Sequence, residues 1–532
     1  MIAKRTNGSR PLLFTLLFVS FAYFYQAGGW NQNSRFDLVR AITNEGTLSI
    51  DPFKHSTGDK AFHDGHYYSD KAPGIALTAV PLVAAVRPIM HAFGGDPETY
   101  EGLALLSYLA TVVTAGLFTA LAGVSLFSLC VELGASPDGA LFAALTFAFA
   151  TPIWTLATIF IGHSFAAAFL VFAFAAAMRV GVADPSRDLR LGAMVGLGAG
   201  WATVSEFPAA VPAALFAALA AFHAWPLGRA RATRILTALT VSALACAAIL
   251  MAYQYACFGS PFHLSYSSEI GYEGMQQGVF GVTLPKLIRL RRILFGGYRG
   301  LLPIAPTLVL APFGLALMMT GRLKPRFVQA RGGADLVEAP DASTVTGYRR
   351  RAAIVAAAIA AYYILLNASY SYWEGGWSYG PRHASPAIPF LCIGLAPLWT
   401  IAPAVGRWVL ALLSTYGAAV TLIAVSTMPL PPAQIRRPVQ ELMLPAFIDG
   451  DLALNTQRFA DGSADADFRA HRAPKAAFNL GMKIGLRGHA SLLPLAAMWL
   501  ACGLALTASV GARRKAHPST ASQTSAAPPA SL

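Results

Sequence analysis

Charged residues are scarce in this chain. Only 12% of its 532 residues are Asp, Glu, Lys or Arg, whereas 55% are hydrophobic. A soluble protein of this size needs more polar side chains to cover its surface. Many apolar runs exceed the roughly 18 residues that cross a bilayer core. The composition therefore excludes a soluble multidomain protein and predicts an all-α polytopic membrane protein.

Cysteines are few, and a signal-peptide cleavage site is lacking. The five cysteines are Cys130, Cys246, Cys257, Cys392 and Cys502. None has metal-ligand spacing, so neither a zinc site nor a disulfide framework is expected. Basic residues precede the apolar run 11–30, but that run is too long for a signal core and no small-residue cleavage site closes it. We interpret it as the first spanning helix.

Basic residues orient the predicted spans. The net charge of +14 comes mostly from short loops between apolar runs, which indicates the positive-inside bias of membrane proteins and not a nucleic-acid partner. The apolar runs are 11–30, 74–94, 102–131, 139–161, 164–182, 191–204, 207–226, 235–256, 301–320, 352–369, 385–404, 408–428 and 489–511. If all of them cross, the loop with Arg187 and Arg190 falls on the wrong side.

The run 74–94 resolves this conflict if it does not cross. It begins with Pro73 and Gly74, contains Arg87, and is followed by acidic residues. We therefore expect it to be an interfacial or re-entrant helix on the outer side, which leaves about 12 spans (11–13) with both termini cytoplasmic. The outer segments are then 31–101, 257–300, 370–384 and 429–488.

The first outer segment is rich in carboxylates. We expect a helix from Phe36 to Thr43, closed by Gly46, followed by turns. The candidate bases for acid–base chemistry are Asp37, Asp51, Asp59 and Asp70, and we prefer Asp37 and Asp51 to Asp59. A solvated loop is the plainer alternative for any single carboxylate. A metal site formed by His55, His63 and His66 with Asp59 or Asp64 matches no firm signature.

Two other outer segments carry cations and aromatic rings. The sequence LPKLIRLRRILFGGYRG predicts a short helix bearing Lys286, Arg289, Arg291, Arg292 and Arg299 beside leucines. It suits an anchor to anionic lipid or a cradle for a lipid phosphate, and both remain open. In SYSYWEGGWSYGPRHASP, Trp373, Glu374, Trp377 and Arg382 suit a sugar beside a phosphate, although an aromatic belt would also contain such tryptophans.

Two polar residues stand at the outer ends of spans. His163 lies between the third and fourth spans, and Glu206 lies between the fifth and sixth. Ionisable groups near the membrane core are costly and often functional. A solvated cavity mouth explains them nearly as well.

These motifs resemble the GT-C superfamily of polyprenyl-phosphate-dependent glycosyltransferases, nearest to family 39, the protein O-mannosyltransferase and aminoarabinose-transferase type. The resemblance rests on the step Arg35-Phe36, on Tyr68-Ser69-Asp70-Lys71-Ala72-Pro73, and on the Trp-x-Gly-Gly-x-Ser-x-Gly-Pro-Arg pattern from Trp373 to Arg382. Three positions depart from the family. Gln32 and Asn33 stand where the family has its acidic pair, and His163 stands where many members have Asp.

The resemblance implies a GT-C-like bundle with interfacial helices in the first outer loop. Its catalytic module would be 1–320, with a cytoplasmic loop 321–351, further spans in 352–511 and a disordered tail 512–532. It also implies transfer of a sugar from a polyprenyl-phosphate donor to an envelope lipid, glycan or protein on the periplasmic side of a bacterial inner membrane. No cofactor is required, although some members use a divalent metal.

The resemblance also implies roles for single residues. The expected phosphate ligands are Lys71, Arg299 and Arg382, and Arg292 is a lower-ranked candidate. The residues expected to stack on sugar or lipid are Tyr67, Tyr68, Trp373 and Trp377. Because the usual acidic pair is replaced, another carboxylate would have to act as base, or the chain is a non-catalytic assembly protein derived from a transferase. A transporter or flippase of a lipid-linked or polar solute is the rival class, although the spans are almost free of charge.

Overall fold

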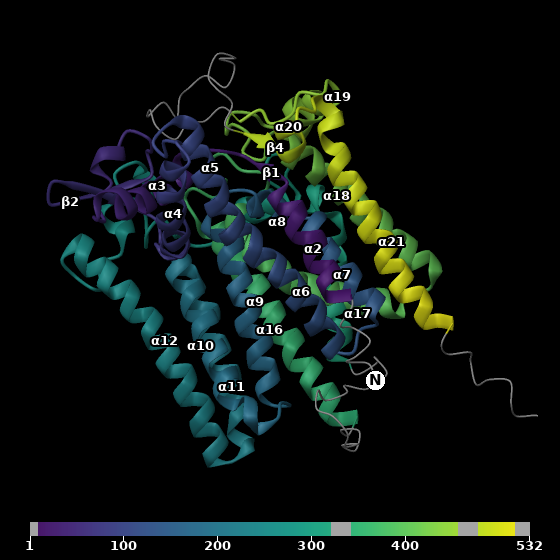
Figure 1. Ribbon diagram of the computed structural model, residues 1–532. Helices are drawn as coiled ribbons and strands as arrows, with labels where there is room; N and C mark the ends of the chain where they lie inside the picture. The colour runs from purple at the N-terminus through teal and green to yellow at the C-terminus, as the bar shows by residue number, and fades with distance from the viewer. Residues whose placement is uncertain (1–8, 321–341, 456–476, 516–532) are drawn as a thin grey trace, which may run out of the picture.

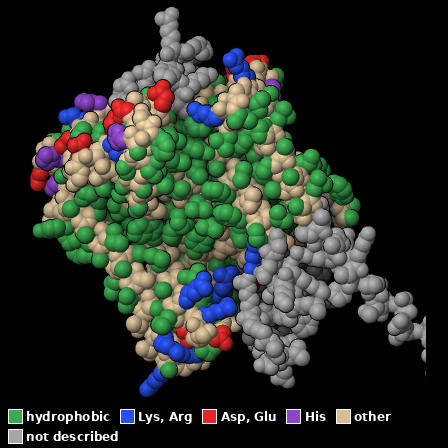
Figure 2. Space-filling model, in the orientation of Figure 1, with side chains coloured by type: hydrophobic (Ala, Val, Ile, Leu, Met, Phe, Trp, Pro, Cys, Tyr) green, Lys and Arg blue, Asp and Glu red, His purple; other side chains and the backbone are tan. Residues whose placement is uncertain are grey.

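The computed structural model describes residues 9–320, 342–455 and 477–515. Within these ranges the chain is almost entirely helix and loop, as the composition predicts, and its long helices form one bundle (Figure 1). Figure 2 shows a broad band of hydrophobic side chains across this bundle. Acidic, basic and histidine side chains gather above the band, and mainly Lys and Arg below it. The chain is thus a multi-pass membrane protein.

The helices of the first half are α2 (Ser9–Ala22), α3 (Trp30–Arg40), α4 (Gly74–Ala92), α5 (Tyr100–Thr111), α6 (Leu117–Glu132), α7 (Pro137–Phe149), α8 (Ile153–Ala157), α9 (Gly162–Val180), α10 (Asp188–Ser205) and α11 (Ala210–Ala224). The strand pairs are β1 (Phe24–Tyr25) with β4 (Phe478–Asn479), and β2 (Lys60–His63) with β3 (His66–Ser69), both antiparallel. A π-helical turn, Ala41–Glu45, prolongs α3.

The helices of the second half are α12 (Arg229–Phe258), α13 (Leu287–Phe295), α14 (Leu301–Ile304), α15 (Ala311–Met319), α16 (Ala342–Ser369), α17 (Ile388–Ile401), α18 (Ala404–Thr427), α19 (Leu444–Ile448), α20 (Leu480–Lys483) and α21 (Leu493–Lys515). A 3-10 turn, Arg382–Ala387, leads into α17.

Nine helical segments of the described chain are long and apolar enough to cross a membrane. They are Gly74–Ala92, Tyr100–Glu132, Gly162–Val180, Phe207–Leu227, Arg229–Phe258, Val345–Ser369, Arg382–Ile401, Ala404–Thr427 and Gly488–Leu506. Length and composition alone admit α4 to this set, so its placement outside the bilayer stays a prediction, as does the count of 12 spans.

Helix α9 forms the centre of the bundle. It is apolar on every side and almost wholly buried, which is the pattern of a helix surrounded by other helices. Its neighbours α6, α10 and α11 pack around it, and α12 packs on α10. A Cβ at Gly196 of α10 would lie 2.1 Å from the Leu239 carbonyl oxygen of α12, so this glycine allows the two backbones to approach closely.

Several apolar runs are not single helices. The run 139–161 breaks between α7 and α8 because Pro152 has no N–H to donate and the Thr151 hydroxyl bonds back to the Phe147 carbonyl. The run 301–320 divides into α14, a 3-10 turn Pro306–Leu310 and α15. In 11–30, α2 ends at Ala22 and the chain continues into β1.

Other predicted boundaries also differ. In the predicted loop 321–351, residues 342–351 are the first turns of α16, and 321–341 lie outside the described residues. In the predicted tail 512–532, α21 continues to Lys515, and the rest lies outside them, as do residues 456–476 of the outer loop 429–488.

Candidate functional site

A β-hairpin in the first loop brings two carboxylates together. Asp64 and Gly65 form its turn with positive φ angles of 48° and 84°, and Asp-Gly is the pair that a tight hairpin turn favours. The strands pair Lys60 with Ser69, so the flanking residues Asp59 and Asp70 emerge side by side. The register of this hairpin thus places two aspartates at one end of the hairpin.

Lys71 lies between these two aspartates. Its Nζ is 2.9 Å from Asp59 Oδ2 and 2.5 Å from Asp70 Oδ2; both aspartates are buried, and 12% of the Lys71 side chain is exposed. Burial alone would raise the pKa of Asp59, but Lys71, the charge of Arg382 and the Tyr272 hydroxyl lower it. Burial raises the pKa of Asp70, and the two carboxylates raise that of Lys71 although burial opposes this. The Lys71 ammonium therefore lies between two carboxyl groups, of which Asp59 has a lowered pKa and Asp70 a raised one.

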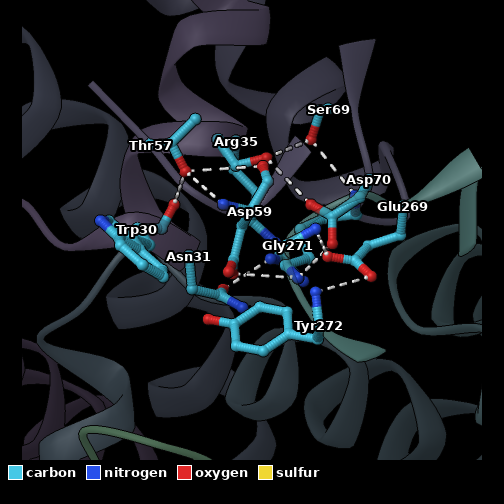
Figure 3. A network of polar contacts seen from close by, with 12 residues as sticks. Trp30, Asn31, Arg35, Thr57, Asp59, Ser69, Asp70, Glu269, Gly271 and Tyr272 are labelled. Carbon is cyan, nitrogen blue, oxygen red and sulfur yellow. Dashed lines mark hydrogen bonds and ion pairs between the residues drawn. The ribbon is translucent and has the colours of Figure 1, made fainter. Parts of the chain in front are cut away.

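Residues from the loop after α12 close this cluster. Glu269 is buried, and its carboxylate accepts hydrogen bonds from the backbone N–H of Gly271 at 2.5 Å and of Tyr272 at 3.2 Å. Burial raises the pKa of Glu269 to about 7. Figure 3 shows Asp59, Asp70 and Glu269 around one polar network with Tyr272 beside them. Glu269 thus fixes the turn that presents Tyr272 to Asp59.

A second polar cluster joins α3 to the ends of α9 and α10. The Arg35 guanidinium donates to Asn31 Oδ1 at 2.6 Å and to Glu206 Oε1 at 2.9 Å. His163 Nδ1 lies 3.4 Å from the same Glu206 oxygen. A Cβ at Gly162 would lie 2.2 Å from Glu206 Oε1, so only glycine fits there. The buried Glu206 carboxylate is therefore paired, as a charge at this depth requires.

Arg382 reaches the same region from the segment before α17. The turn Gly375-Gly376 has positive φ at both residues, and the Arg382 side chain lies against it, 2.9 Å from where a Cβ of Gly375 would be. Within the described residues, no carboxylate lies within ion-pair distance of Arg382, and its Nε is buried without a hydrogen-bond partner. This guanidinium can therefore accept an anion from outside.

One cavity connects these groups. It encloses about 870 Å³, its open mouth included. Its lining residues are Asn31, Arg35, Asp59, Lys71, His163, Glu206, Pro208, Tyr266, Tyr272, Met275, Tyr363, Leu366, Tyr370, Tyr372, Arg382, His383 and Pro386. They come from segments hundreds of residues apart and combine cations, carboxylates and aromatic rings. Such a cavity can bind an anionic group and a polar ring together, with a carboxylate available for proton transfer.

The cavity contains some of the residues predicted from the sequence. Asp59, Lys71, His163 and Arg382 line it, and Asp70 contacts it through Lys71. Asp37 and Asp51, placed ahead of Asp59 as candidate bases, do not line it. Asp37 is buried against the Ser56 hydroxyl and Arg40, and burial raises its pKa to about 7.

Asp51 makes its own contacts outside the cavity. It binds His66 Nδ1 at 2.6 Å and the Tyr67 N–H at 2.7 Å, and His66 with the N–H of Tyr67 lowers its pKa against the effect of burial. The hairpin turn brings Asp59, and not Asp37 or Asp51, to the cavity.

The predicted aromatic and basic ligands mostly lie elsewhere. Trp373, Glu374, Arg292 and Arg299 do not line the cavity. Arg299 is buried, donates to the Gly376 carbonyl at 2.8 Å and lies 4.0 Å over the Tyr298 ring, so it supports the glycine turn beneath Arg382. Arg292 lies 5.8 Å over the Trp373 ring.

The remaining aromatic candidates pack in other places. Tyr67 packs against Phe62 and Tyr68 against Phe258, while Trp377 lies on a small apolar cluster around Leu430. The tyrosines that do line the cavity are Tyr266, Tyr272, Tyr363, Tyr370 and Tyr372. Tyr370 and Tyr372 belong to the predicted outer segment 370–384, and Tyr266 and Tyr272 to 257–300, whereas Tyr363 lies in the predicted span 352–369.

Gln32 and Asn33, at the positions of the family's acidic pair, have structural contacts. Gln32 donates to the Gly28 carbonyl at 3.4 Å and Asn33 to the Ser56 carbonyl at 2.6 Å. Asn31 is the neighbour that faces the cavity. It lies one helical turn from Arg35, and this i, i+4 spacing is the signal that could have paired them.

The residues that the structure describes form no metal-binding site. No three His, Cys, Asp or Glu side chains there come close enough together to hold an ion. His66 pairs with Asp51, and His63 with Asp64 at 3.5 Å, as two separate contacts. Asp59 and Asp70 both face the Lys71 ammonium, which does not suit a metal cation between them.

No protein-family model matches the chain, and a search of curated proteins found none that matches it. The functional assignment therefore rests on the geometry of the cavity and on the motifs of the sequence.

Proposed function

We propose that the chain is a membrane glycosyltransferase that moves a sugar from a polyprenyl-phosphate donor to an extracytoplasmic acceptor. The proposal includes a GT-C-like bundle of about 12 spans in a bacterial-type inner membrane, with the cavity on the periplasmic side. The acceptor would be an envelope lipid, a glycan or a protein.

One observation carries the proposal: Asp59, held beside Lys71, lines the same cavity as Arg382, which has no carboxylate within ion-pair distance among the described residues. A lipid-linked sugar joins an anionic phosphate to a polar ring, and transfer needs a base for the acceptor hydroxyl. The planar guanidinium of arginine can donate two parallel hydrogen bonds to phosphate oxygens, so Arg382 would bind the donor phosphate, with Lys71 nearby.

The proposed reaction is a single displacement. The acceptor oxygen attacks the anomeric carbon from the face opposite the phosphate, and the new C–O bond forms as the bond to the phosphate oxygen breaks. The bonding electron pair leaves with the lipid phosphate, and Asp59 takes the acceptor's proton. Arg382 and Lys71 stabilise the negative charge that grows on the leaving group. The product has inverted stereochemistry.

The environment of Asp59 supports its role as the base. Its lowered pKa keeps it ionised at neutral pH, whereas Asp70 has a raised pKa. Tyr272 bonds to Asp59 and lines the cavity, as do Tyr266 and Tyr372. Aromatic rings pack on the apolar faces of sugars, so these tyrosines would orient the ring against Arg382 and Asp59.

The test is release of polyprenyl phosphate from a lipid-linked sugar by the purified protein in liposomes. We expect Lys71→Ala and Arg382→Ala to reduce release by on the order of a hundredfold, because each removes charge stabilisation of the leaving group. Asp51→Asn is the matched control, since this loop carboxylate lies outside the cavity, and it should leave release unchanged.

Unchanged release in both cavity variants would refute the phosphate assignment. Movement of intact donor across the liposome membrane, without release of polyprenyl phosphate, would instead indicate a flippase. The experiment therefore separates the transferase from the flippase.

A further inference from the structure

Helix α13 carries an exposed apolar stripe interrupted by cations. We infer that α13 lies in the headgroup layer of the membrane and binds the phosphate groups of anionic phospholipids. This surface is separate from the proposed sugar transfer, because no residue of α13 lines the cavity.

The place of α13 in the fold indicates the level of the bilayer surface. The segment leading into it bonds to the last residues of α16, from the Thr283 N–H to the Ser369 carbonyl at 2.9 Å and from the Lys286 N–H to the Ala368 carbonyl at 3.2 Å. The segment Val345–Ser369 is long and apolar enough to span a membrane. Helix α13 therefore begins where a membrane-crossing helix ends, which is the hydrocarbon boundary.

The apolar side chains of α13 and the residues just before it face outward. Leu284 is 83% exposed, Leu287 81%, Ile288 51% and Phe295 62%, whereas Ile293 is buried. Positions 287, 288 and 295 share one face of α13, and Leu284 lies in the segment that leads into this helix. A helix at a water-facing surface would bury this stripe, so the exposed stripe fits contact with acyl chains.

The cations are placed for headgroups. Lys286, Arg291 and Arg292 are exposed, and within the described chain none lies within ion-pair distance of a carboxylate. Arg291 lies one turn from Leu287, so the guanidinium would meet phosphate while the leucine enters the acyl layer. Phosphates of anionic lipids are the complementary charge at this level. This favours the lipid anchor over the donor cradle, the two alternatives that the sequence leaves open.

A fluorescent label on α13 tests the inference in the full-length protein. The five native cysteines are all buried, so Leu287→Cys provides a selective site for an environment-sensitive fluorophore. The labelled protein is placed in vesicles of equimolar phosphatidylcholine and phosphatidylglycerol, with bromine on the chains of one lipid or of the other. We expect both to quench, with brominated phosphatidylglycerol quenching more strongly, because each cation near the surface favours anionic lipid by up to about fivefold.

Two sets of variants isolate the cations. Combined Lys286→Gln, Arg291→Gln and Arg292→Gln changes should make the two brominated lipids quench equally. The matched control, Arg187→Gln with Arg190→Gln, neutralises exposed arginines next to α10 and should keep the preference. Arg291→Lys keeps the positive charge and should also keep the preference for brominated phosphatidylglycerol. An unchanged thermal unfolding midpoint shows that each variant is folded.

Four results would overturn the inference. Absence of quenching by either lipid would place α13 in water. Equal quenching in the unmodified helix would exclude a preference for anionic lipid, and a preference that survives in the triple variant would not come from these cations. Loss of the preference on adding inorganic phosphate would mean that the cations take free phosphate and not a lipid headgroup.

Discussion

Replacement of Lys71 by Met tests the centre of the cavity. The ammonium lies 2.9 Å from Asp59 and 2.5 Å from Asp70, and only 12% of the Lys71 side chain is exposed. Methionine fills a similar volume but leaves two buried carboxylates without their shared cation. Breaking a buried ion pair from one side typically costs about 3 to 5 kcal/mol, and we expect a loss of unfolding free energy in this range near pH 8.

The loss should depend on pH with a definite sign. Without Lys71, burial and mutual repulsion raise the pKa of one carboxyl above its unfolded value, so the folded variant is destabilised above that pKa and recovers as pH falls and the carboxyl takes up a proton. The difference from the native protein should therefore shrink by up to about 1.4 kcal/mol for each pH unit between pH 8 and 5. In the native protein the Lys71 pKa is raised above 10.5, so the lysine itself does not titrate in this window.

Thermal or denaturant unfolding of the protein in detergent measures this effect at each pH. Adding Asp70→Asn to Lys71→Met should restore much of the loss, because it removes one of the two facing charges. Lys54→Met is the matched control in the same loop, since Lys54 forms no ion pair among the described residues. A loss near pH 8 below about 1 kcal/mol, or one that is equally large at pH 5, would refute the reasoning, because an exposed pair contributes no more than this.

Two further variants test the surroundings of the cavity. The raised pKa of about 7 for Asp37 means that the unfolding free energy of the native protein falls as pH rises from 3.8 to 7. Asp37→Asn removes this loss, so the variant should gain stability over the native protein as pH rises from 5 to 8. Equal pH profiles of the unfolding midpoint would contradict this. Gly162→Ala should lower transfer activity by on the order of a hundredfold by displacing Glu206, which would lie 2.2 Å from the new Cβ. Gly503→Ala, where a Cβ meets nothing within 4 Å, is its control, and equal activities of the two variants would contradict the steric argument.

The sequence predicts the segments of the site better than its contacts. Hydropathy alone indicates the polytopic helical fold, and three predicted outer segments do supply residues to the cavity. The approach of Asp59 to Asp70 was within reach of the sequence, because Asp64-Gly65 marks a two-residue turn midway between them. Nothing in the sequence around Asp37 shows that its carboxyl packs against Ser56 and Arg40 outside the cavity.

Other features depend on packing across the whole chain. Arg35 and Glu206 are 171 residues apart, and their contact forms only where α3 meets the end of α10. The breaks in the runs 139–161 and 301–320 follow from local prolines, which hydropathy averages conceal. The exposed stripe of α13 is visible only once the burial of Ile293 shows which face turns inward.

The central claim is that Asp59 and Arg382 act on one lipid-linked sugar in this cavity. The most direct measurement compares donor binding and single-turnover release of polyprenyl phosphate in Asp59→Asn, Arg382→Ala and Asp51→Asn. The account predicts that Asp59→Asn binds donor but does not release polyprenyl phosphate, that Arg382→Ala binds donor weakly, and that Asp51→Asn behaves like the native protein. Native release by Asp59→Asn, or native donor binding and release by Arg382→Ala, would contradict it.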